Sequence, residues 1–487
     1  MVVNSLNFLL FFVVVLIVYY LPISRKSPKF QNLWLFLTSY FFYGFADWKM
    51  IPLLLGFTVM FYVIGLWLKS EMEKGHSQNA SNITTLGVVL GVGVLLYFKY
   101  LNFFADSFAQ LLKAIGLNVS WTTLNIVLPI GVSFFTFKLI SYIIEIHREH
   151  IEPSKDFFEF GTYIAFFPTI LSGPIDRPGK FIPQLKVVRK VDMIKMTQGG
   201  QQILWGIFKK MVIADNLMGI INPTWEVSTM SGSTYVLAAI LYPVQMYADF
   251  SGYSDMAIGV GKMLGMKISS NFFHPFFARN IAEYWRNWHI TLTGWLTDYV
   301  FSPLNIAFRN FGNFGIIAAI IINFFLIGLW HGANWTFALF GLYHGFLYIP
   351  LILSGDFGKR KKMKTGKFDL PRLNDFIKMC LTFVFVAIGL VLFKATSLTA
   401  AWSYFALMAQ PSIMCAPKFI GSANAVFLIL FPILVIILAL DWKNRKKECP
   451  IFFDNSHSWK AILSYVLIVS SIYYLGVESS TFIYFNF

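Results

Sequence analysis

The sequence predicts an all-α integral membrane protein. Hydrophobic residues make up 57% of the 487 residues and charged residues only 13%, and the mean hydropathy is +0.63, well outside the composition of soluble globular domains. Apolar stretches of about 17 to 25 residues, each long enough to cross a bilayer as a helix, recur from Asn4 to the C-terminus. A soluble α/β enzyme does not fit this pattern.

The predicted membrane spans follow one another along the whole chain. They cover residues 5–22, 31–46, 51–69, 84–104, 122–144, 200–222, 234–261, 313–330, 336–354, 373–394, 423–442 and 460–478, about eleven to twelve spans in all. Residues 157–178 are interrupted by Pro168 and "SGPIDRP", and residues 271–305 mix aromatic with charged side chains. We expect both to be re-entrant or interfacial, because broken backbone at membrane depth persists only where protein or water satisfies it.

The loops indicate a single polytopic membrane domain over residues 1–487. No loop is long enough to hold a separate soluble domain, and no internal repeat is evident. Cys380, Cys415 and Cys449 are far apart and form no pairing motif, so neither a disulfide framework nor a zinc site is expected. The N-terminal apolar run lacks a basic leader, and we expect it to be a retained first helix.

The net charge of +15 reflects membrane topology. Loops that would lie on one side hold most of the basic residues, namely Arg25, Lys26, Lys29, Arg148, Lys155, Lys180, Lys186, Arg189, Lys190, Lys195, Lys359–Lys362, Lys364, Lys367, Lys443, Arg445, Lys446 and Lys447. Because Lys and Arg favour the cytoplasmic side, this distribution predicts an extracytoplasmic N-terminus. The basic residues form no recognition motif, so we expect membrane lipids and no nucleic acid around the chain.

Two stretches place histidines among aromatic residues. In "EYWRNWHITLTGWLTDYV", His289 and Arg286 lie close to Trp288, which fits either an interfacial aromatic belt with a snorkelling arginine or a functional site. In "LIGLWHGANWTFALFGLYHG", Trp330 and Asn334 flank His331, and His344 follows. His331 is either a structural core histidine or a catalytic base, since an imidazole titrates near neutrality and can both accept and return a proton.

Two further stretches carry polar residues. "QMYADFSGYSDMAIGVGKMLG" puts Asp249, Ser251, Tyr253 and Asp255 in a predicted span. These residues fit either of two arrangements. One is a polar seam between packed helices, where Gly261 and Gly265 would let another helix approach closely. The other is the lining of a tunnel. Near the predicted cytoplasmic face, Glu145 and Arg148 are spaced to pair on a helix. Arg177 and Lys180 would either meet an anionic donor or mark orientation.

Several kinds of chemistry have no support in the sequence. His274, His289, His331 and His344 form no HExxH motif and have no carboxylate partner at ligand spacing. We treat His331 and His344 as two residues of one helix, thirteen apart, and therefore do not expect them to converge on a metal ion. No G-x-S-x-G nucleophile elbow, phosphate-binding loop or dinucleotide-binding glycine pattern is found. We therefore expect neither metal nor covalent serine catalysis.

The polar stretches resemble blocks of the membrane-bound O-acyltransferase family. The blocks are "SYFFYGFADW", "LPIGVSFFTF", "GPIDRPGKFIPQL", "GIFKKMVIADNL", "YADFSGYSDMAIG", "WRNWHITLTGWLTDYVFSPL" and "GLWHGANWTFALFGLYHG". They occur in family order over roughly residues 39–345, whereas the C-terminal helices, residues 373–478, carry no signature. The bacterial branch of alginate and polysaccharide O-acetyltransferase membrane subunits is the most similar.

The resemblance implies a bundle of helices around a tunnel, entered by an acyl thioester from the cytoplasm and by the acceptor from the far side. His331 falls on the family's invariant histidine and would be the general base. His289 falls on the second characteristic position and would position the acyl group or acceptor. Asp249, Ser251, Tyr253, Asp255, Trp288, Trp330, Asn334 and His344 would line the tunnel, and Arg177, Lys180 and Arg286 would bind the acyl donor.

The implied activity is O-acyl transfer in the bacterial cytoplasmic membrane. Acetyl-CoA, or another acyl thioester, would be the co-substrate, with no bound cofactor. The acetyl group would pass toward an exported polysaccharide, directly or through an extracytoplasmic acetyltransferase protein. Thr297 and Phe340 stand where relatives in the family often have arginine and tryptophan. These two departures bear on which acyl group or partner protein the chain would prefer.

Two alternatives stay open at this point. One is D-alanyl transfer to teichoic acid from a carrier-protein thioester, within the same family. The other is a polytopic transporter, because many spans with buried ionisable residues also describe that class. Matching inverted halves, common in transporters, are not evident in the sequence.

Overall fold

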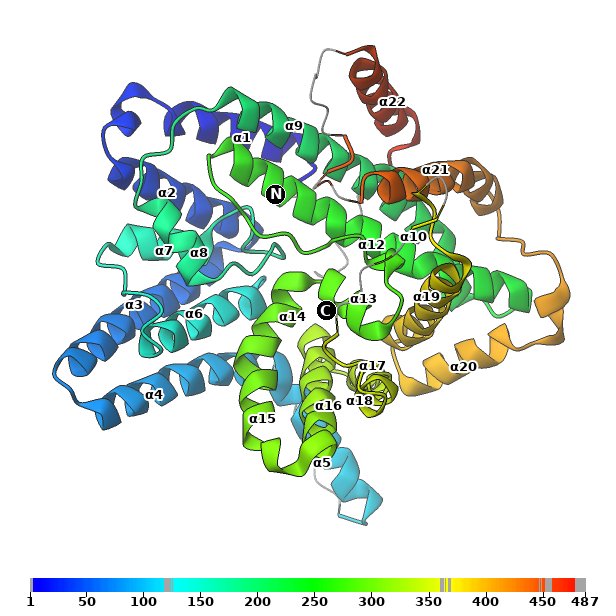
Figure 1. Ribbon diagram of the computed structural model, residues 1–487, viewed down its shortest axis with the longest axis horizontal. Helices are drawn as coiled ribbons and strands as arrows, with labels where there is room; N and C mark the ends of the chain where they lie inside the picture. Colours follow the sequence, from blue (N-terminus) through cyan, green and yellow to red (C-terminus); the bar gives the residue numbers. More distant parts are fainter. Residues whose placement is uncertain are drawn as a thin grey trace. The chain divides into compact units, whose positions relative to one another are not determined.

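The computed structural model describes residues 3–117, 124, 126–359, 363, 365–366, 369–445, 447, 449–451 and 458–477. These residues form helices and two isolated β-bridges, and no strand occurs among them, which confirms the predicted all-α class (Figure 1). Several predicted features fall outside the described residues. They are the start of the span 122–144 and the basic residues Arg360, Lys361, Lys362, Lys364, Lys367 and Lys446.

The chain divides into two compact units, and it passes from one to the other within α9, within α12 and between Ser269 and Ser270. The first unit comprises Met1–Ile203 and Met256–Ser269. Its helices are α1 (Leu6–Tyr19), η1 (Pro22–Arg25), α2 (Pro28–Ala46), η2 (Trp48–Met50), α3 (Ile51–Glu73), α4 (Ser77–Leu95), the π-helical turn η3 (Leu96–Tyr100), α5 (Leu101–Ala114), α6 (Val132–His147), α7 (Phe157–Ala165), α8 (Pro178–Leu185) and parts of α9 (Met193–Phe208) and α12 (Gly232–Met263).

The second unit comprises Leu204–Asp255 and Ser270–Phe487. Beyond its parts of α9 and α12, it contains the π-helical turn η4 (Lys209–Ala214), α10 (Asp215–Ile221), α11 (Pro223–Glu226), η5 (Pro275–Phe277), α13 (Ile281–Asn287), α14 (Ile290–Leu296), the π-helical turn η6 (Thr297–Phe301), α15 (Ser302–Ala307), η7 (Arg309–Phe311), α16 (Gly312–His331), α17 (Trp335–Phe346), α18 (Ile349–Leu353), α19 (Leu373–Lys394), α20 (Leu398–Met408), η9 (Pro411–Met414), α21 (Ala423–Lys443) and α22 (Trp459–Leu475).

Six described helices are long and apolar enough to cross a membrane. They are Trp48–Glu73, Ser77–Ala114, Arg309–His331, Trp335–Leu353, Leu373–Lys394 and Ala423–Lys443, and three shorter apolar helices accompany them. The protein is therefore a multi-pass membrane protein, while the total of eleven to twelve spans stays a prediction. The two stretches predicted to be broken are broken, since residues 157–178 form α7 followed by irregular backbone and residues 271–305 form several short helical pieces.

The irregular backbone after α7 is held by buried polar groups of the first unit. Lys138 on α6 is 1% exposed, and its Nζ donates to the carbonyl oxygen of Tyr163 at 3.1 Å and to Oγ1 of Thr169 at 3.1 Å. The backbone N–H of Phe167 donates to Oγ of Ser39 at 3.1 Å. A cation at the carbonyl end of a helix is favourable, and these bonds satisfy backbone groups that water does not reach.

Arg189 stabilises the same unit, although the sequence indicated only a basic loop residue. Its side chain is buried, with Nε donating to the hydroxyl of Tyr19 at 2.7 Å and Nη2 donating to Oδ1 of Asn32 at 2.8 Å. Its Nη1 donates to the carbonyl oxygen of Leu185 at 3.0 Å. The guanidinium thus links α1, α2 and the end of α8. Arg189 therefore has a structural role that its use as a marker of membrane orientation did not predict.

Glycines bring α9 and α12 into backbone contact within each unit. A Cβ at Gly259 would lie 2.6 Å from the carbonyl oxygen of Gly199, and one at Gly252 would lie 2.8 Å from that of Gly206. The predicted seam at Gly261 and Gly265 is therefore wrong. Gly261 faces the side chain of Ile268, and Gly265 has a φ of +75°, which favours glycine.

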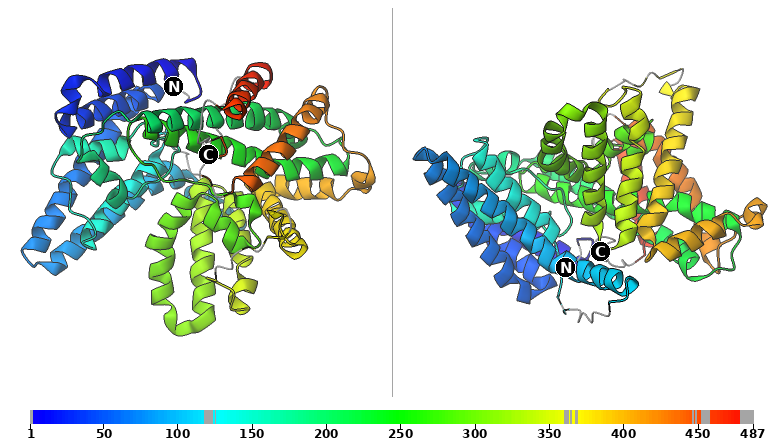
Figure 2. Two further views of the ribbon diagram at one scale, coloured as in Figure 1. Left: turned by 45° about the horizontal axis from the view of Figure 1, so that its top comes forward. Right: turned by 90° about the horizontal axis from the view of Figure 1, so that it is seen from below.

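In the second unit, α16 and α17 form an antiparallel hairpin that lies side by side in both views of Figure 2, where it is yellow-green. Gly328 on α16 faces Gly341 on α17, and a Cβ at Gly341 would lie 3.1 Å from Cα of Gly328. A Cβ at Gly328 would overlap the carbonyl oxygen of Phe337. Because that atom belongs to the backbone, only glycine permits this separation of the two helices.

We expect Gly328→Ala to lower the stability of the folded protein by about 1–3 kcal/mol, because the hairpin must separate to admit the methyl group. Gly93→Ala on α4 is the matched control. A Cβ at Gly93 would meet no side chain and no neighbouring helix within 4 Å, and Ala there is expected to be neutral or stabilising by up to about 1 kcal/mol. Thermal unfolding of the purified protein in detergent measures both, and equal midpoints for the two variants would contradict the packing argument.

Candidate active site

His331 is the last residue of α16, where the chain turns into α17. Gly332 follows in an extended conformation, and Asn334 begins α17 by accepting a hydrogen bond from the backbone N–H of Thr336 at 3.0 Å. The Asn334 amide also donates to the carbonyl oxygen of Thr396 at 2.9 Å. Asn334 therefore fixes the turn next to His331, which is itself 4% exposed.

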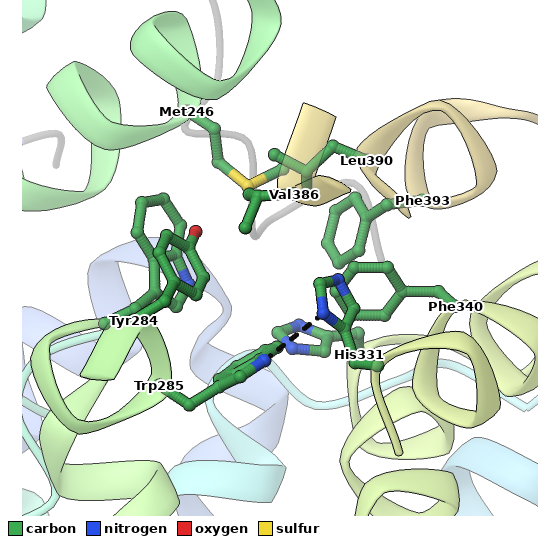
Figure 3. A pocket seen from close by; sticks show the side chains of 10 residues that line it. Met246, Tyr284, Trp285, His331, Phe340, Val386, Leu390 and Phe393 are labelled. Atoms are coloured by element: carbon green, nitrogen blue, oxygen red, sulfur yellow. Dashed lines mark hydrogen bonds between the residues drawn. The ribbon is translucent and has the colours of Figure 1, made fainter. Parts of the chain in front are cut away.

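His331 lines a small cavity of the second unit (Figure 3). The cavity has a volume of about 10 Å³, roughly the room that one water molecule needs. Its wall consists of Met246 from α12, Tyr284 and Trp285 from α13 with the adjoining Trp288, His331 from α16, Phe340 and His344 from α17, and Val386, Leu390 and Phe393 from α19. The imidazole thus borders open space, while a tunnel through the protein stays a prediction.

His344 lies on the same cavity, contrary to the expectation that it would not converge with His331. The two histidines belong to different helices of the hairpin, and close packing at Gly328 and Gly341 turns both toward the cavity. In the part of the chain that the structure describes, no group of three or more His, Cys, Asp or Glu side chains has an arrangement suited to a metal ion.

The tautomer of His344 follows from its hydrogen bond to Trp285. Trp285 Nε1 donates to His344 Nδ1 at 3.3 Å, and because an indole is a donor only, Nδ1 must be the acceptor and Nε2 carries the hydrogen. Nε2 faces α19, where a Cβ at Gly389 would lie 2.6 Å from it. His344 therefore orients Trp285 on the cavity wall.

His289 lies between α13 and α14 with a φ of +46°, in the left-handed region. Its fully buried ring lies 4.6 Å from the ring centre of Phe250 and 5.5 Å from that of Trp330, which in turn lies 4.9 Å from His331. Trp330 therefore contacts both predicted catalytic histidines. Burial lowers the pKa of His289 to about 3, so its imidazole is neutral at physiological pH.

The acidic residues of α12 take part in a buried ion-pair network. Lys209 contacts Asp255 at 2.5 Å and donates to Ser251 Oγ at 2.8 Å. Lys210 contacts Asp249 and Asp215, both at 2.8 Å. The π-helical turn η4 carries both lysines, and ion pairing satisfies charges that would otherwise be costly inside a membrane protein.

The remaining predicted site residues lie in three places. Asp249, Ser251, Asp255 and the buried Tyr253 are on α12 but are not among the ten side chains that line the cavity. Arg286 is on α13, the helix that supplies Tyr284 and Trp285 to the wall. Arg177 and Lys180 belong to the first unit, as does the predicted Glu145–Arg148 pair, which is present at 3.6 Å.

Sequence reasoning missed most of the cavity wall and the paired lysines. Lys209 and Lys210 stand inside an apolar run, and that position was a usable signal, since buried charges in a membrane helix need partners. The α19 residues Val386, Leu390 and Phe393 carry no such signal. They are ordinary apolar residues of an apolar helix.

The several long apolar helices define a multi-pass membrane protein, and its second unit buries a histidine beside an apolar cavity. Residues 148–369 match the model of the membrane-bound O-acyltransferase family. The chain is 35% identical to a probable alginate O-acetylase of Azotobacter vinelandii over 395 residues, which cover 80% of this chain and 75% of that protein. The chain belongs to the membrane-bound O-acyltransferase family, and it is an O-acyltransferase.

Two further relatives act on other acceptors, according to their names. A peptidoglycan O-acetyltransferase of Helicobacter pylori is 29% identical over 95% of this chain and 92% of its own length. A teichoic acid D-alanyltransferase of Streptococcus thermophilus is 30% identical over 53% of this chain and 65% of its own length.

We expect Lys210→Met to destabilise the protein by about 3–5 kcal/mol, because it leaves the carboxylates of Asp215 and Asp249 buried without their counter-charge. Lys195→Met is the control. Lys195 forms an exposed pair with Asp192 at 3.7 Å, and its loss should change stability by less than about 1 kcal/mol. Thermal unfolding in detergent is the measurement, and a Lys210→Met midpoint equal to that of Lys195→Met would refute a stabilising role for the network.

We expect His344→Leu to cost about 1–3 kcal/mol of stability, because the Trp285 N–H is left buried without an acceptor. His344→Asn should cost less, since its amide oxygen can replace Nδ1 as acceptor. A double-mutant cycle with Trp285→Phe measures the coupling. Strictly additive effects of His344→Leu and Trp285→Phe would show that the hydrogen bond contributes nothing.

Proposed function

We propose that the protein transfers an acetyl group from cytoplasmic acetyl-CoA toward an exported polysaccharide or a partner protein, with His331 as the general base. One observation carries the proposal: the His331 imidazole borders a cavity walled by apolar and aromatic side chains. An imidazole titrates near neutrality and can both accept and return a proton. The names of the relatives support acyl transfer to cell-envelope polymers.

In the proposed reaction, His331 takes up one proton and later gives one back. His331 accepts the proton of the acceptor hydroxyl as its oxygen attacks the thioester carbonyl carbon. The tetrahedral intermediate then breaks its C–S bond, and the imidazolium returns the proton to the departing thiolate. The products are the acetyl ester and free coenzyme A, so no bound cofactor and no metal are needed.

Further residues are proposed to position the reactants. Trp288 and His344 would shape the space beside His331, since both line the cavity. His289 would act on that space through Trp330, whose ring contacts the rings of both histidines. Arg286 would bind phosphate groups of the donor from α13.

The other predicted positioning residues are proposed to act less directly. Asp249, Ser251 and Asp255 would hold α12 in place through Lys209 and Lys210, and Tyr253 and Asn334 would support the helices that form the wall. Arg177 and Lys180 would bind donor phosphates on the cytoplasmic side.

The proposed setting is the bacterial cytoplasmic membrane, with the N-terminus outside. The acetyl group would leave on the extracytoplasmic side, where a separate acceptor or acetyltransferase protein would place it on the polysaccharide. D-alanyl transfer from a carrier-protein thioester is the alternative within the family. A transporter is no longer an alternative, because the family assignment makes the chain an acyltransferase.

We expect His331→Ala to lower acetyl transfer by about 10²–10⁴-fold, the usual contribution of a general base. Membranes containing the full chain are supplied with labelled acetyl-CoA, and both free coenzyme A and label in polymer are measured. His76→Ala is the control, because His76 is 55% exposed and belongs to the first unit.

The same measurement tests His289. A folded His289→Ala variant with full turnover removes this residue from the site. A folded His331→Ala variant with full turnover overturns the proposed function.

A further inference from the structure

The cavity has a wall on α19, a helix outside the stretches that resemble the family. Val386, Leu390 and Phe393 are four and three residues apart, so they share one helix face, and each is at most 3% exposed. The Phe393 ring centre lies 5.0 Å from that of His331 and 5.2 Å from that of Phe340. Phe393 therefore closes the space directly beside the imidazole (Figure 3).

This wall is fixed by packing around it. The Phe393 ring also contacts that of Phe337 on α17, with 4.9 Å between the centres. One turn earlier on α19, a Cβ at Gly389 would lie 2.6 Å from His344 Nε2 and 3.0 Å from Cε1 of Tyr343. The α19 backbone thus lies directly against α17, and such close-packed interiors widen only at a cost.

The volume of the cavity beside His331 restricts the size of the acyl group that can lie there. The attacked carbonyl carbon must lie close to the oxygen whose proton the imidazole takes, so the rest of the acyl group points into the surrounding wall. A volume of about 10 Å³ is roughly the room that one water molecule needs, so an acyl group beside His331 must displace part of this wall. Each methylene beyond the acetyl methyl would require a larger movement of Phe393 or Leu390.

We propose that Phe393, together with Leu390 and Phe340, restricts the transferred acyl group to acetyl. This inference rests on the proposed function and adds the residues that set acyl size. The same wall disfavours a D-alanyl group, because the ten lining side chains include no carboxylate to neutralise its ammonium.

The test compares donors of increasing length. Membranes containing the full chain receive acetyl-, propionyl- or butyryl-CoA, and release of coenzyme A is measured after subtracting release by His331→Ala membranes. The wild type should use propionyl-CoA about 10–200-fold less well than acetyl-CoA, the range typical of one methylene in an apolar pocket. Phe393→Ala should raise the propionyl-to-acetyl ratio at least about tenfold.

Phe385→Ala is the matched control, because Phe385 is on the same helix but is 45% exposed. Its propionyl-to-acetyl ratio should equal that of the wild type. If Phe393→Ala does not fold, Phe393→Leu and Leu390→Ala provide the same comparison with smaller losses of packing.

The outcomes separate the two hypotheses. A wild type that does not turn over acetyl-CoA contradicts the proposed function. A wild type that uses acetyl- and propionyl-CoA equally, or folded cavity variants with an unchanged ratio, overturns the role of α19 while leaving acyl transfer intact.

Discussion

Close backbone packing between α16 and α17 is the constraint on which the candidate site depends. Gly328 and Gly341 let the two helices approach so closely that a Cβ at Gly341 would lie 3.1 Å from Cα of Gly328. At that separation His331 and His344, on different helices, face one cavity, and α19 can complete the wall through Gly389. A membrane interior offers no hydrophobic driving force for helix association, so small residues that allow extensive contact take over that role.

Burial of polar groups determines much of the remaining architecture. Lys138 neutralises the carbonyl end of α7, Arg189 joins three helices of the first unit, and Lys209 and Lys210 pair with carboxylates of α12. In each case a charged side chain is satisfied inside a protein that is otherwise apolar. The backbone after α7 can therefore leave helical geometry while Lys138 and Ser39 satisfy its polar groups.

The chemistry proposed for His331 depends on the same low-polarity surroundings. In the proposed reaction, an imidazole beside aromatic rings would exchange a proton with the substrate without competition from bulk water. The hydrogen bond from Trp285 fixes the tautomer of His344, which makes that residue an acceptor in the wall. His344 therefore has a structural role in the wall of the cavity that His331 also lines.

The sequence by itself determined the all-α membrane class, the breaks near Pro168 and in residues 271–305, and His331 as a candidate base, because hydropathy and isolated polar residues are local signals. The predicted extent of α19, residues 373–394, is the same in the structure. Only the tertiary structure decided that Phe393 and Leu390 face His331, that Gly252 and Gly259 rather than Gly261 and Gly265 contact α9, and that Lys209 and Lys210 neutralise Asp255 and Asp249. An apolar helix in a membrane has no polar face to show which side is buried, so the partner of each residue follows from packing between helices and not from the residue pattern.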